Sequence, residues 1–424
     1  MRIKTHRSLV GPALVAAGLL FTGCDSDSNV SGPGNTNGDR TVSGFVTDDA
    51  AAGKSAGTIE GAVVTAAELN AQGRLSQAEG DATTDASGRF VLETSADSDL
   101  MVVTATKGDF ESSILVDATG STSTETPAMT SETYAEAEVY VEAQRQNEEE
   151  VTAADVAAFV DAEIAARIRS GSETAARVAV AIANSAEAEE EYAEENEGFD
   201  DEDFDRAKEE DERTYRDYQS SMRGQVSASA AVNARVALER AVARAHATAG
   251  ASATAQAKAR GASKTAMQSF TANMDATVRF HLRKKAELMS AIASGAAIEA
   301  EFQAEGSSQT STVSQAAASL EAQVRSAGSE SQIEAAWDEF RSDIKAAVAA
   351  ELSVSSTLID AAITSANSVE AKLVADLLIA TTVDALVNAK AAYYSAAEST
   401  MAAALSTSAK ANFGAKVLVL ASGS

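Results

Sequence analysis

Cysteine, proline, histidine and tryptophan are scarce in this chain of 424 residues: it has one cysteine, three prolines, three histidines and one tryptophan. A single cysteine excludes an internal disulfide framework, a Cys-rich zinc site and a two-cysteine redox centre. Basic side chains are also few, since 34 Lys and Arg stand against 63 Asp and Glu, a formal charge of −29. This charge argues against duplex nucleic acid and anionic membrane surfaces as partners, because both would be repelled.

The first 23 residues have the pattern of a secretory signal peptide. A basic start precedes a mostly apolar stretch, 9–21, which is too short to span a bilayer as a helix. The basic residues are Arg2, Lys4 and Arg7. Residues 1–23 are therefore predicted to be removed from the mature protein.

The only cysteine, Cys24, follows this stretch in the sequence Leu-Phe-Thr-Gly-Cys. This resembles the lipobox of bacterial lipoproteins, in which signal peptidase cuts before the cysteine, whose sulfur and new amino group are then acylated. Phe21 departs from the commoner Leu or Val, whereas Thr22 and Gly23 fit. The resemblance implies a membrane anchor at Cys24, and two or more acyl chains make such an anchor stable. The alternative is an ordinary signal peptide with an incidental cysteine.

Residues 24–39 are predicted to be the acylated cysteine and a flexible tether. The segment after Cys24 is rich in Ser, Gly, Asn and Asp and has no apolar period. Its acidic-serine start resembles the surface-export signal of lipoproteins from Bacteroidetes-like bacteria. We therefore expect a lipid-anchored protein of the outer membrane or cell surface.

Residues 40–127 are predicted to form a small antiparallel β-sandwich. Short stretches rich in Val, Thr and Phe alternate with period 2 between Gly, Asp and Ser turns. The expected strands are Thr41–Val46, Ala62–Ala66, Phe90–Glu93, Met101–Thr106 and Ser113–Asp117. Asp85 and Gly88 suit the first and fourth positions of a type I turn before the second half of a hairpin.

The order VSGFVTD, IEGAVVTA and TTDASGRF resembles the carboxypeptidase regulatory-like domain, a transthyretin-like sandwich of secreted bacterial proteins. The matching residues are Gly44, Val46, Asp48, Gly61, Ala62, Val64, Thr84, Asp85, Gly88 and Phe90. The resemblance covers about a fifth of the chain. It implies a structural or docking module and carries over no catalytic residue.

Residues 130–424 are predicted to be a long Ala-rich α-helical bundle, so the fold class is α+β and multidomain. No proline follows Pro127, and strong helix formers dominate. Apolar residues recur with a period of 3.6, for example from Ile333 to Val348, and a broad apolar face is expected over 358–387. The span 213–300 is expected to contain one or two very long helices.

Helix starts are predicted at Thr152 and Ser331, where capping-box patterns begin. Helix ends are predicted at Gly171, Gly306 and Gly328.

One segment, residues 187–212, holds 16 acidic and two basic side chains. Asp201, Asp203, Asp205 and Glu212 match positions 1, 3, 5 and 12 of an EF-hand calcium loop. Arg206 stands where that loop needs Gly, and Lys208 stands at the usual apolar position. These departures favour a solvated acidic run over a weak cation site.

Other patterns indicate no site. Residues 52–55, Ala-Gly-Lys-Ser, lack the first Gly of a phosphate loop, and Ser342 and Lys345 lie in an amphipathic helix without partner motifs. His246 and His281 have no neighbouring Ser and carboxylate arrangement. The basic cluster around His281 (Arg279, Arg283, Lys284 and Lys285) is expected to face the acidic run across an antiparallel helix pair; an anionic ligand is the alternative.

The acid excess, with many small residues, resembles proteins of extreme halophiles; a merely acidic mesophilic surface protein is the alternative. Our first hypothesis is a non-enzymatic, lipid-anchored envelope protein without cofactor, which displays its bundle or contacts an envelope or extracellular protein. The second is a lipoprotein whose bundle binds a ligand or cation. An enzyme ranks third, because no nucleophile, base and stabiliser can be assembled. A deep polar pocket favours binding, and continuous alanine packing favours a structural role.

Overall fold

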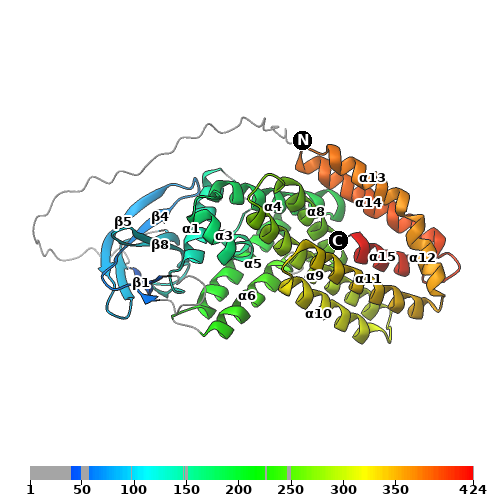
Figure 1. The fold of residues 1–424 in the computed structure, drawn as a ribbon, viewed down its shortest axis with the longest axis horizontal. Helices are drawn as coiled ribbons and strands as arrows, with labels where there is room; N and C mark the ends of the chain where they lie inside the picture. The colour runs from blue at the N-terminus through cyan, green and yellow to red at the C-terminus, as the bar shows by residue number, and fades with distance from the viewer. Residues whose placement is uncertain are drawn as a thin grey trace, which may run out of the picture. The chain divides into compact units, whose positions relative to one another are not determined.

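The computed structural model describes residues 40–48, 57–96, 98–146, 148, 151–224, 227–245 and 250–423. Over these residues the predicted α+β class is confirmed, because strands come first and helices follow (Figure 1). The predicted signal peptide, Cys24 and the tether lie outside the described residues. So do residues 52–55 and His246, and all these predictions stay predictions.

The strands form two main sheets. One has the order β6-β1-β9, and its strands are β1 (Arg40–Phe45), β6 (Arg89–Thr94) and β9 (Ser123–Glu125). The other has the order β5-β4-β7-β8, and its strands are β4 (Val63–Leu69), β5 (Leu75–Thr83), β7 (Leu100–Lys107) and β8 (Phe110–Asp117). A short pair is made by β2 (Thr47–Asp48) and β3 (Gly57–Thr58). Most pairs are antiparallel as predicted, but β1 and β9 run parallel.

Both sheets contribute to one hydrophobic core. Val42 and Phe90 from the first sheet pack with Val64, Met101 and Ile114 from the second. All five side chains are buried because alternate residues of a strand point to the same face. This is the period-2 pattern from which the strands were predicted.

The predicted turn before β6 is confirmed. The amide of Gly88 donates to the carbonyl of Asp85 at 2.8 Å. Gly88 has φ of +75°, and a Cβ there would lie 2.7 Å from the carbonyl oxygen of Val46. Both facts require glycine at this position.

Fourteen helices follow among the described residues. They are α1 (Ser131–Arg145), α2 (Ala153–Phe159), α3 (Ala162–Arg169), α4 (Ala175–Glu197), α5 (Asp201–Ser221), α6 (Ala228–Val242), α8 (Ala253–Phe270), α9 (Ala276–Ala304), α10 (Thr310–Ser326), α11 (Glu330–Leu352), α12 (Ser356–Ser365), α13 (Asn367–Ile379), α14 (Val383–Ala404) and α15 (Ala411–Gly423).

The span 213–300 includes most of one very long helix, as predicted, because α9 has 29 residues, but the rest of the span is divided into shorter helices. Four helices, α5, α6, α8 and α9, share this span. New helices begin where Ser227, Ser252 and Asp275 accept hydrogen bonds from the backbone of the next turn. These short polar side chains compete for backbone N–H groups and so start a helix within an Ala-rich stretch.

Other predicted helix signals have mixed outcomes. Thr152 and Asp155 form the expected capping box, and Gly171 and Gly306 have the left-handed backbone expected at helix ends. The start predicted at Ser331 is wrong, because the N-cap of α11 is Ser329. The apolar face over 358–387 is divided among three helices, and Leu378 of α13 is 82% exposed.

Small residues let the central helices approach closely. Ser185 Oγ of α4 lies 2.8 Å from Ser263 Oγ of α8, and both side chains are buried. A Cβ on Gly295 of α9 would lie only 2.7 Å from Cβ of Ala317 on α10. Side chains larger than these would force the helices apart. The core of the helical region is thus built on Ala, Ser and Gly contacts.

The four-stranded sheet also contacts the helices. Buried Leu69, Val102 and Leu115 belong to the same hydrophobic cluster as the helical core. The carbonyl oxygen of Leu115 accepts hydrogen bonds from Tyr215 Oη at 3.1 Å and from Gln219 Nε2 at 2.6 Å. The described sheets and helices therefore share packing across the predicted boundary at 127–130.

Over the described residues, no individual helix has both the length and the apolar composition needed to cross a membrane. Helix α11 and the segment Ser356–Ile379 meet these criteria only as a pair, and that pair is bent by 115°.

Candidate functional site

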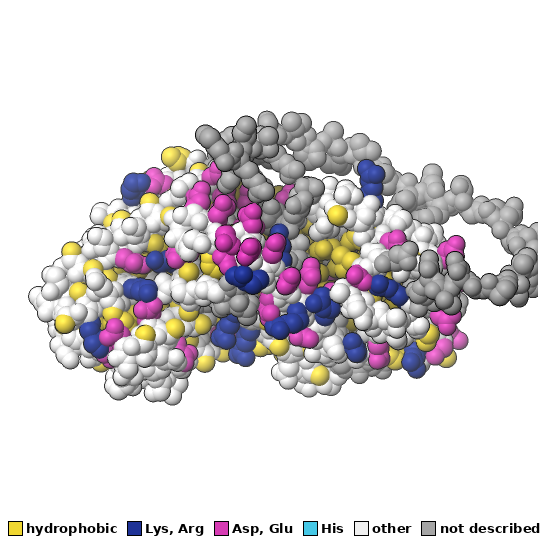
Figure 2. Space-filling model, turned by 180° about the vertical axis from the view of Figure 1, so that it is seen from behind, with side chains coloured by type: hydrophobic (Ala, Val, Ile, Leu, Met, Phe, Trp, Pro, Cys, Tyr) yellow, Lys and Arg dark blue, Asp and Glu magenta, His cyan; other side chains and the backbone are white. Residues whose placement is uncertain are grey.

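The acidic run forms the end of α4 and most of α5 rather than a loop. Asp200 caps α5 by accepting from the amides of Glu202 and Asp203, each at 3.1 Å. Carboxylates in the first turn of a helix are stabilised by its dipole. Figure 2 shows one face of the molecule on which Asp and Glu side chains gather in a band.

The four residues proposed as calcium ligands all lie on helix α5. They are Asp201, Asp203, Asp205 and Glu212. Successive positions of a helix turn by about 100°, so Asp203 points away from Asp201 and Asp205. Glu212 lies seven residues beyond Asp205, about 10 Å further along the axis at about 1.5 Å per residue. The helix therefore does not bring these side chains together. Among the residues that the structure describes, no group of three or more His, Cys, Asp or Glu is arranged to hold a metal ion.

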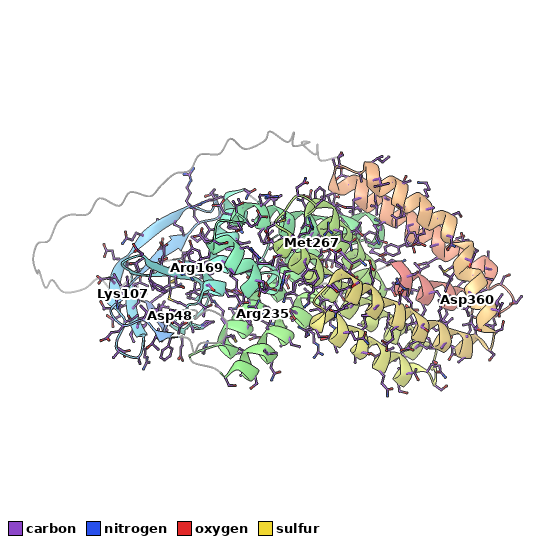
Figure 3. All side chains as sticks on the ribbon, in the orientation of Figure 1. Asp48, Lys107, Arg169, Arg235, Met267 and Asp360 are labelled. Atoms are coloured by element: carbon purple, nitrogen blue, oxygen red, sulfur yellow. The ribbon has the colours of Figure 1, made fainter. Side chains whose placement is uncertain are left out.

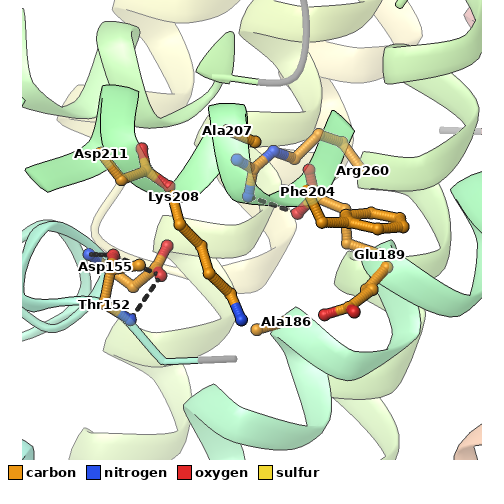
Figure 4. A pocket seen from close by; sticks show the side chains of 10 residues that line it. Thr152, Asp155, Ala186, Glu189, Phe204, Ala207, Lys208, Asp211 and Arg260 are labelled. Atoms are coloured by element: carbon orange, nitrogen blue, oxygen red, sulfur yellow. Dashed lines mark hydrogen bonds and ion pairs between the residues drawn. The ribbon is translucent and has the colours of Figure 1, made fainter. Parts of the chain in front are cut away.

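Two other carboxylates of the acidic run lie inside the protein. Glu189 of α4 and Asp211 of α5 line a cavity of about 40 Å³ together with Asp155 of α2 and Arg260 of α8. Lys208 of α5 lies between the Asp155 and Glu189 sides of this cavity (Figure 4). We call it the acidic cavity.

Arg260 and Glu189 form the central ion pair of the acidic cavity. Arg260 Nη1 lies 2.6 Å from Glu189 Oε2, and each side chain is only 5% exposed. Arg260 Nη2 also donates to the carbonyl of Val242. Asp155 accepts from the hydroxyl of Thr152 at 2.7 Å and from its amide at 3.1 Å. The acidic cavity is thus held by four helices and a helix cap.

Burial has the largest effect on the pKa values of Glu189 and Asp211 in the acidic cavity. Loss of hydration raises the pKa of Glu189 to about 7, against the opposing effect of Arg260. Burial also raises the pKa of Asp211 well above its ordinary value, and Asp155 adds to this effect. Asp211 Oδ1 and Arg260 Nε are buried without a hydrogen-bond partner from the described protein. A cavity of this size and polarity accommodates ordered water, which needs about 10–15 Å³ per molecule.

A second, larger cavity lies where the sheets meet the helices. It has a volume of about 400 Å³ and is lined by residues from the strands, α1, α5 and α6. Its charged residues are Glu132 and Glu136 of α1 and Arg235 of α6, which is labelled in Figure 3. We call it the junction cavity.

Arg235 is shared by the two carboxylates of the junction cavity. Its Nη2 contacts Glu132 Oε1 and lies 3.3 Å from Glu136 Oε1. Its Nη1 donates to the carbonyls of Ala157 and Val160. Burial raises the pKa of Glu136 to about 8, although Arg235 opposes this shift. The same carboxylates raise the pKa of Arg235, which therefore stays charged.

The prediction that the basic cluster faces the acidic run is wrong. Each of its described side chains bonds to other parts of the chain. The partners are the carbonyl of Ala272 for Arg279, Asp161 for His281, Glu330 for Arg283, the carbonyl of Ala327 for Lys284, and Glu239 for Lys285. Lys345 of the Ser-x-x-Lys pattern pairs with Asp360 at 3.3 Å.

The buried members of these cavities were missed by the sequence analysis, although a signal existed. Asp211 lies seven residues after Phe204 and four before Tyr215, both buried, and so falls on the inner stripe of α5. Glu189 lies four residues after buried Ser185 on α4. Residues 187–212 were interpreted as one solvated acidic run, so this helical period was not recognised.

Comparisons with known proteins identify no relative of this chain. No family model, no curated protein and no solved structure matches this chain.

Proposed function

We propose that this chain is a lipid-anchored protein of the outer membrane or cell surface, with a structural or interaction role and no catalytic activity. The observation that carries the structural role is the close packing of the central helices. Ser185 meets Ser263, and Gly295 meets Ala317, at distances that leave no room for larger side chains. A bundle packed in this way is a rigid body rather than a shell around a central cleft.

The anchor rests on Cys24, the only cysteine and hence the only acylation site of this type. Cys24→Ser should move the protein from the detergent phase to the aqueous phase in a partition assay. Ser26→Ala, two residues further along, is the matched control and should leave the distribution unchanged. An unchanged distribution of Cys24→Ser would refute the lipid anchor.

The structural role can be separated from ligand binding in cells that express the protein. If contact and rigidity are the function, Cys24→Ser and a bundle-loosening Gly295→Leu should both reproduce the phenotype of a deletion. Glu136→Gln, which changes the junction cavity, should retain function. A Glu136→Gln variant that is folded and as severe as the deletion would contradict the structural role.

A second candidate function is favoured by one observation. The junction cavity, at about 400 Å³, falls in the size range of small-molecule sites, about 300–1,000 Å³. A surface lipoprotein that binds a ligand is therefore the alternative.

A further inference from the structure

We propose that the junction cavity binds a small organic cation, of the quaternary ammonium class, between Glu136 and the ring of Tyr215. This inference does not depend on the structural role or on the lipid anchor. It rests on the charge balance, the lining and the hydrogen bonds of the cavity.

The first argument is the charge balance. Glu132, Glu136 and Arg235 are the only charged side chains that line the described cavity, so two carboxylates share one guanidinium. Both terminal nitrogens of Arg235 are already engaged, one by the two carboxylates and the other by two backbone carbonyls. An anionic ligand would therefore find the guanidinium occupied. When Glu136 is ionised, the three side chains carry one excess negative charge, and a bound cation restores neutrality.

The second argument is the aromatic lining. Tyr215 and Tyr218, both buried, line the cavity from α5, and the guanidinium of Arg235 already lies over the Tyr218 ring, 5.6 Å from its centre. The Tyr215 hydroxyl is committed to the carbonyl of Leu115 at 3.1 Å, so its ring rather than its hydroxyl is left for a ligand. Aromatic faces attract cations, and most strongly when water is excluded.

The third argument concerns the rest of the ligand. Ile114, Pro127 and Met222 add an apolar wall to the cavity. A hydrated metal ion gains nothing from such a wall, and no group of three or more His, Cys, Asp or Glu among the described residues is arranged to hold one. A methylated ammonium group carries both the charge and the apolar surface that this lining complements.

Proton release should accompany binding. The groups that act on Glu136 are Glu132 on its own helix, Arg235 on α6 and Lys285 on α9, with the tyrosines of α5 beside it. Burial keeps the Glu136 carboxyl protonated up to about pH 8. A cation favours the ionised carboxylate and so competes with this proton. Affinity should therefore rise by about tenfold between about pH 7 and about pH 9, as expected for one site with this pKa.

The test is calorimetric titration of the full chain with choline, which has a fixed charge over this pH range. The control ligand is 3,3-dimethylbutan-1-ol, which has the same shape without the charge. We expect saturable choline binding that strengthens about tenfold with pH, and no comparable binding of the alcohol. Equal binding of both ligands, or no saturable choline binding, would overturn the proposal without any variant.

Two variants localise the site. Glu136→Gln should abolish the pH dependence and weaken choline binding at about pH 9 by at least about tenfold. Glu138→Gln, on the same helix but outside this cavity, should bind choline like the original protein. Retained pH-dependent binding in a folded Glu136→Gln variant would overturn the assignment to this cavity.

Glycerophosphocholine separates a free cation from a lipid headgroup. Its phosphodiester would lie near Glu132 and Glu136, so we expect it to bind more weakly than choline. Binding of glycerophosphocholine without binding of choline would overturn the assignment of a free organic cation.

Discussion

Arg260 Nη1 lies 2.6 Å from Glu189 Oε2 and joins α8 to α4 in the interior of the helical region. Both side chains are almost fully buried, and Asp155 and Asp211 line the same small cavity. Removing two charges from water costs several kcal/mol per ion, which their attraction repays only with good geometry. The pair therefore makes the position of α8 against α4 sensitive to the loss of either partner.

Arg260→Met should destabilise the fold by about 3–5 kcal/mol, because it leaves buried carboxylates without their cation. The free energy of unfolding from urea titration measures this effect. Arg206→Met is the control, since Arg206 forms a surface pair with Asp203 and should cost less than about 1 kcal/mol. Adding Glu189→Gln to Arg260→Met should recover part of the loss. A cost for Arg260→Met equal to that of the control would contradict the central role of the pair.

Asp211→Asn should stabilise the protein at about pH 8 by about 1–3 kcal/mol. Burial raises the pKa of Asp211, so the folded state holds a proton that the unfolded chain releases above about pH 4. Stability from this group is thus complete at low pH and is lost as the pH rises through the folded pKa. The gain from Asn should shrink towards about pH 5. Melting temperatures at both pH values measure it, with exposed Asp205→Asn as the control.

Gly295→Ala should destabilise α9, although alanine is the better helix former by about 1 kcal/mol. The new Cβ would lie 2.7 Å from Cβ of Ala317 and force α9 and α10 apart. The expected cost is about 1–3 kcal/mol, measured by thermal unfolding. Adding Ala317→Gly should remove most of it. If the double variant is no more stable than Gly295→Ala, the contact does not limit helix packing.

Calcium and magnesium at equal ionic strength should have equal effects on the melting temperature. The four proposed ligands of the acidic run lie along one helix, where only general screening acts on them. Molar monovalent salt should stabilise the helical region by screening the repulsion among its carboxylates. Asp201→Asn with Glu212→Gln should not alter the response to calcium. A calcium-selective rise that this double variant abolishes would instead establish a cation site.

The strands and helices that could be predicted are those whose apolar residues recur at a regular interval. Phe90 and Val64 follow the two-residue period of half-buried strands, and Trp337 and Ile344 follow the helical period of α11. Strand β5 was missed because Ala78 is its only buried residue, so no alternation marks it. The breaks at Ser252 and Asp275 were missed because a single polar residue in an Ala-rich stretch fits both a helix interior and a helix start.

Neither cavity could be predicted from the sequence. Each is assembled from residues far apart in the sequence, such as Asp155 with Arg260 or Glu136 with Arg235. Helical periodicity shows which side chains point inwards, and it does not show which helices become neighbours. Helix pairs that pack through Ala, Ser and Gly contacts are difficult to recognise in a sequence in which these residues occur throughout.

The parallel pairing of β1 with β9 has a mechanical consequence for an anchored protein. The tether would enter at Arg40, the start of β1, and the chain leaves β9 at Glu125 towards the helices. Because the two strands run in the same direction, these points lie at opposite ends of the pair. Tension between a membrane and the helical region would therefore load their hydrogen bonds in shear, so that they bear the force together. An antiparallel pair loaded at one end would instead open one bond at a time.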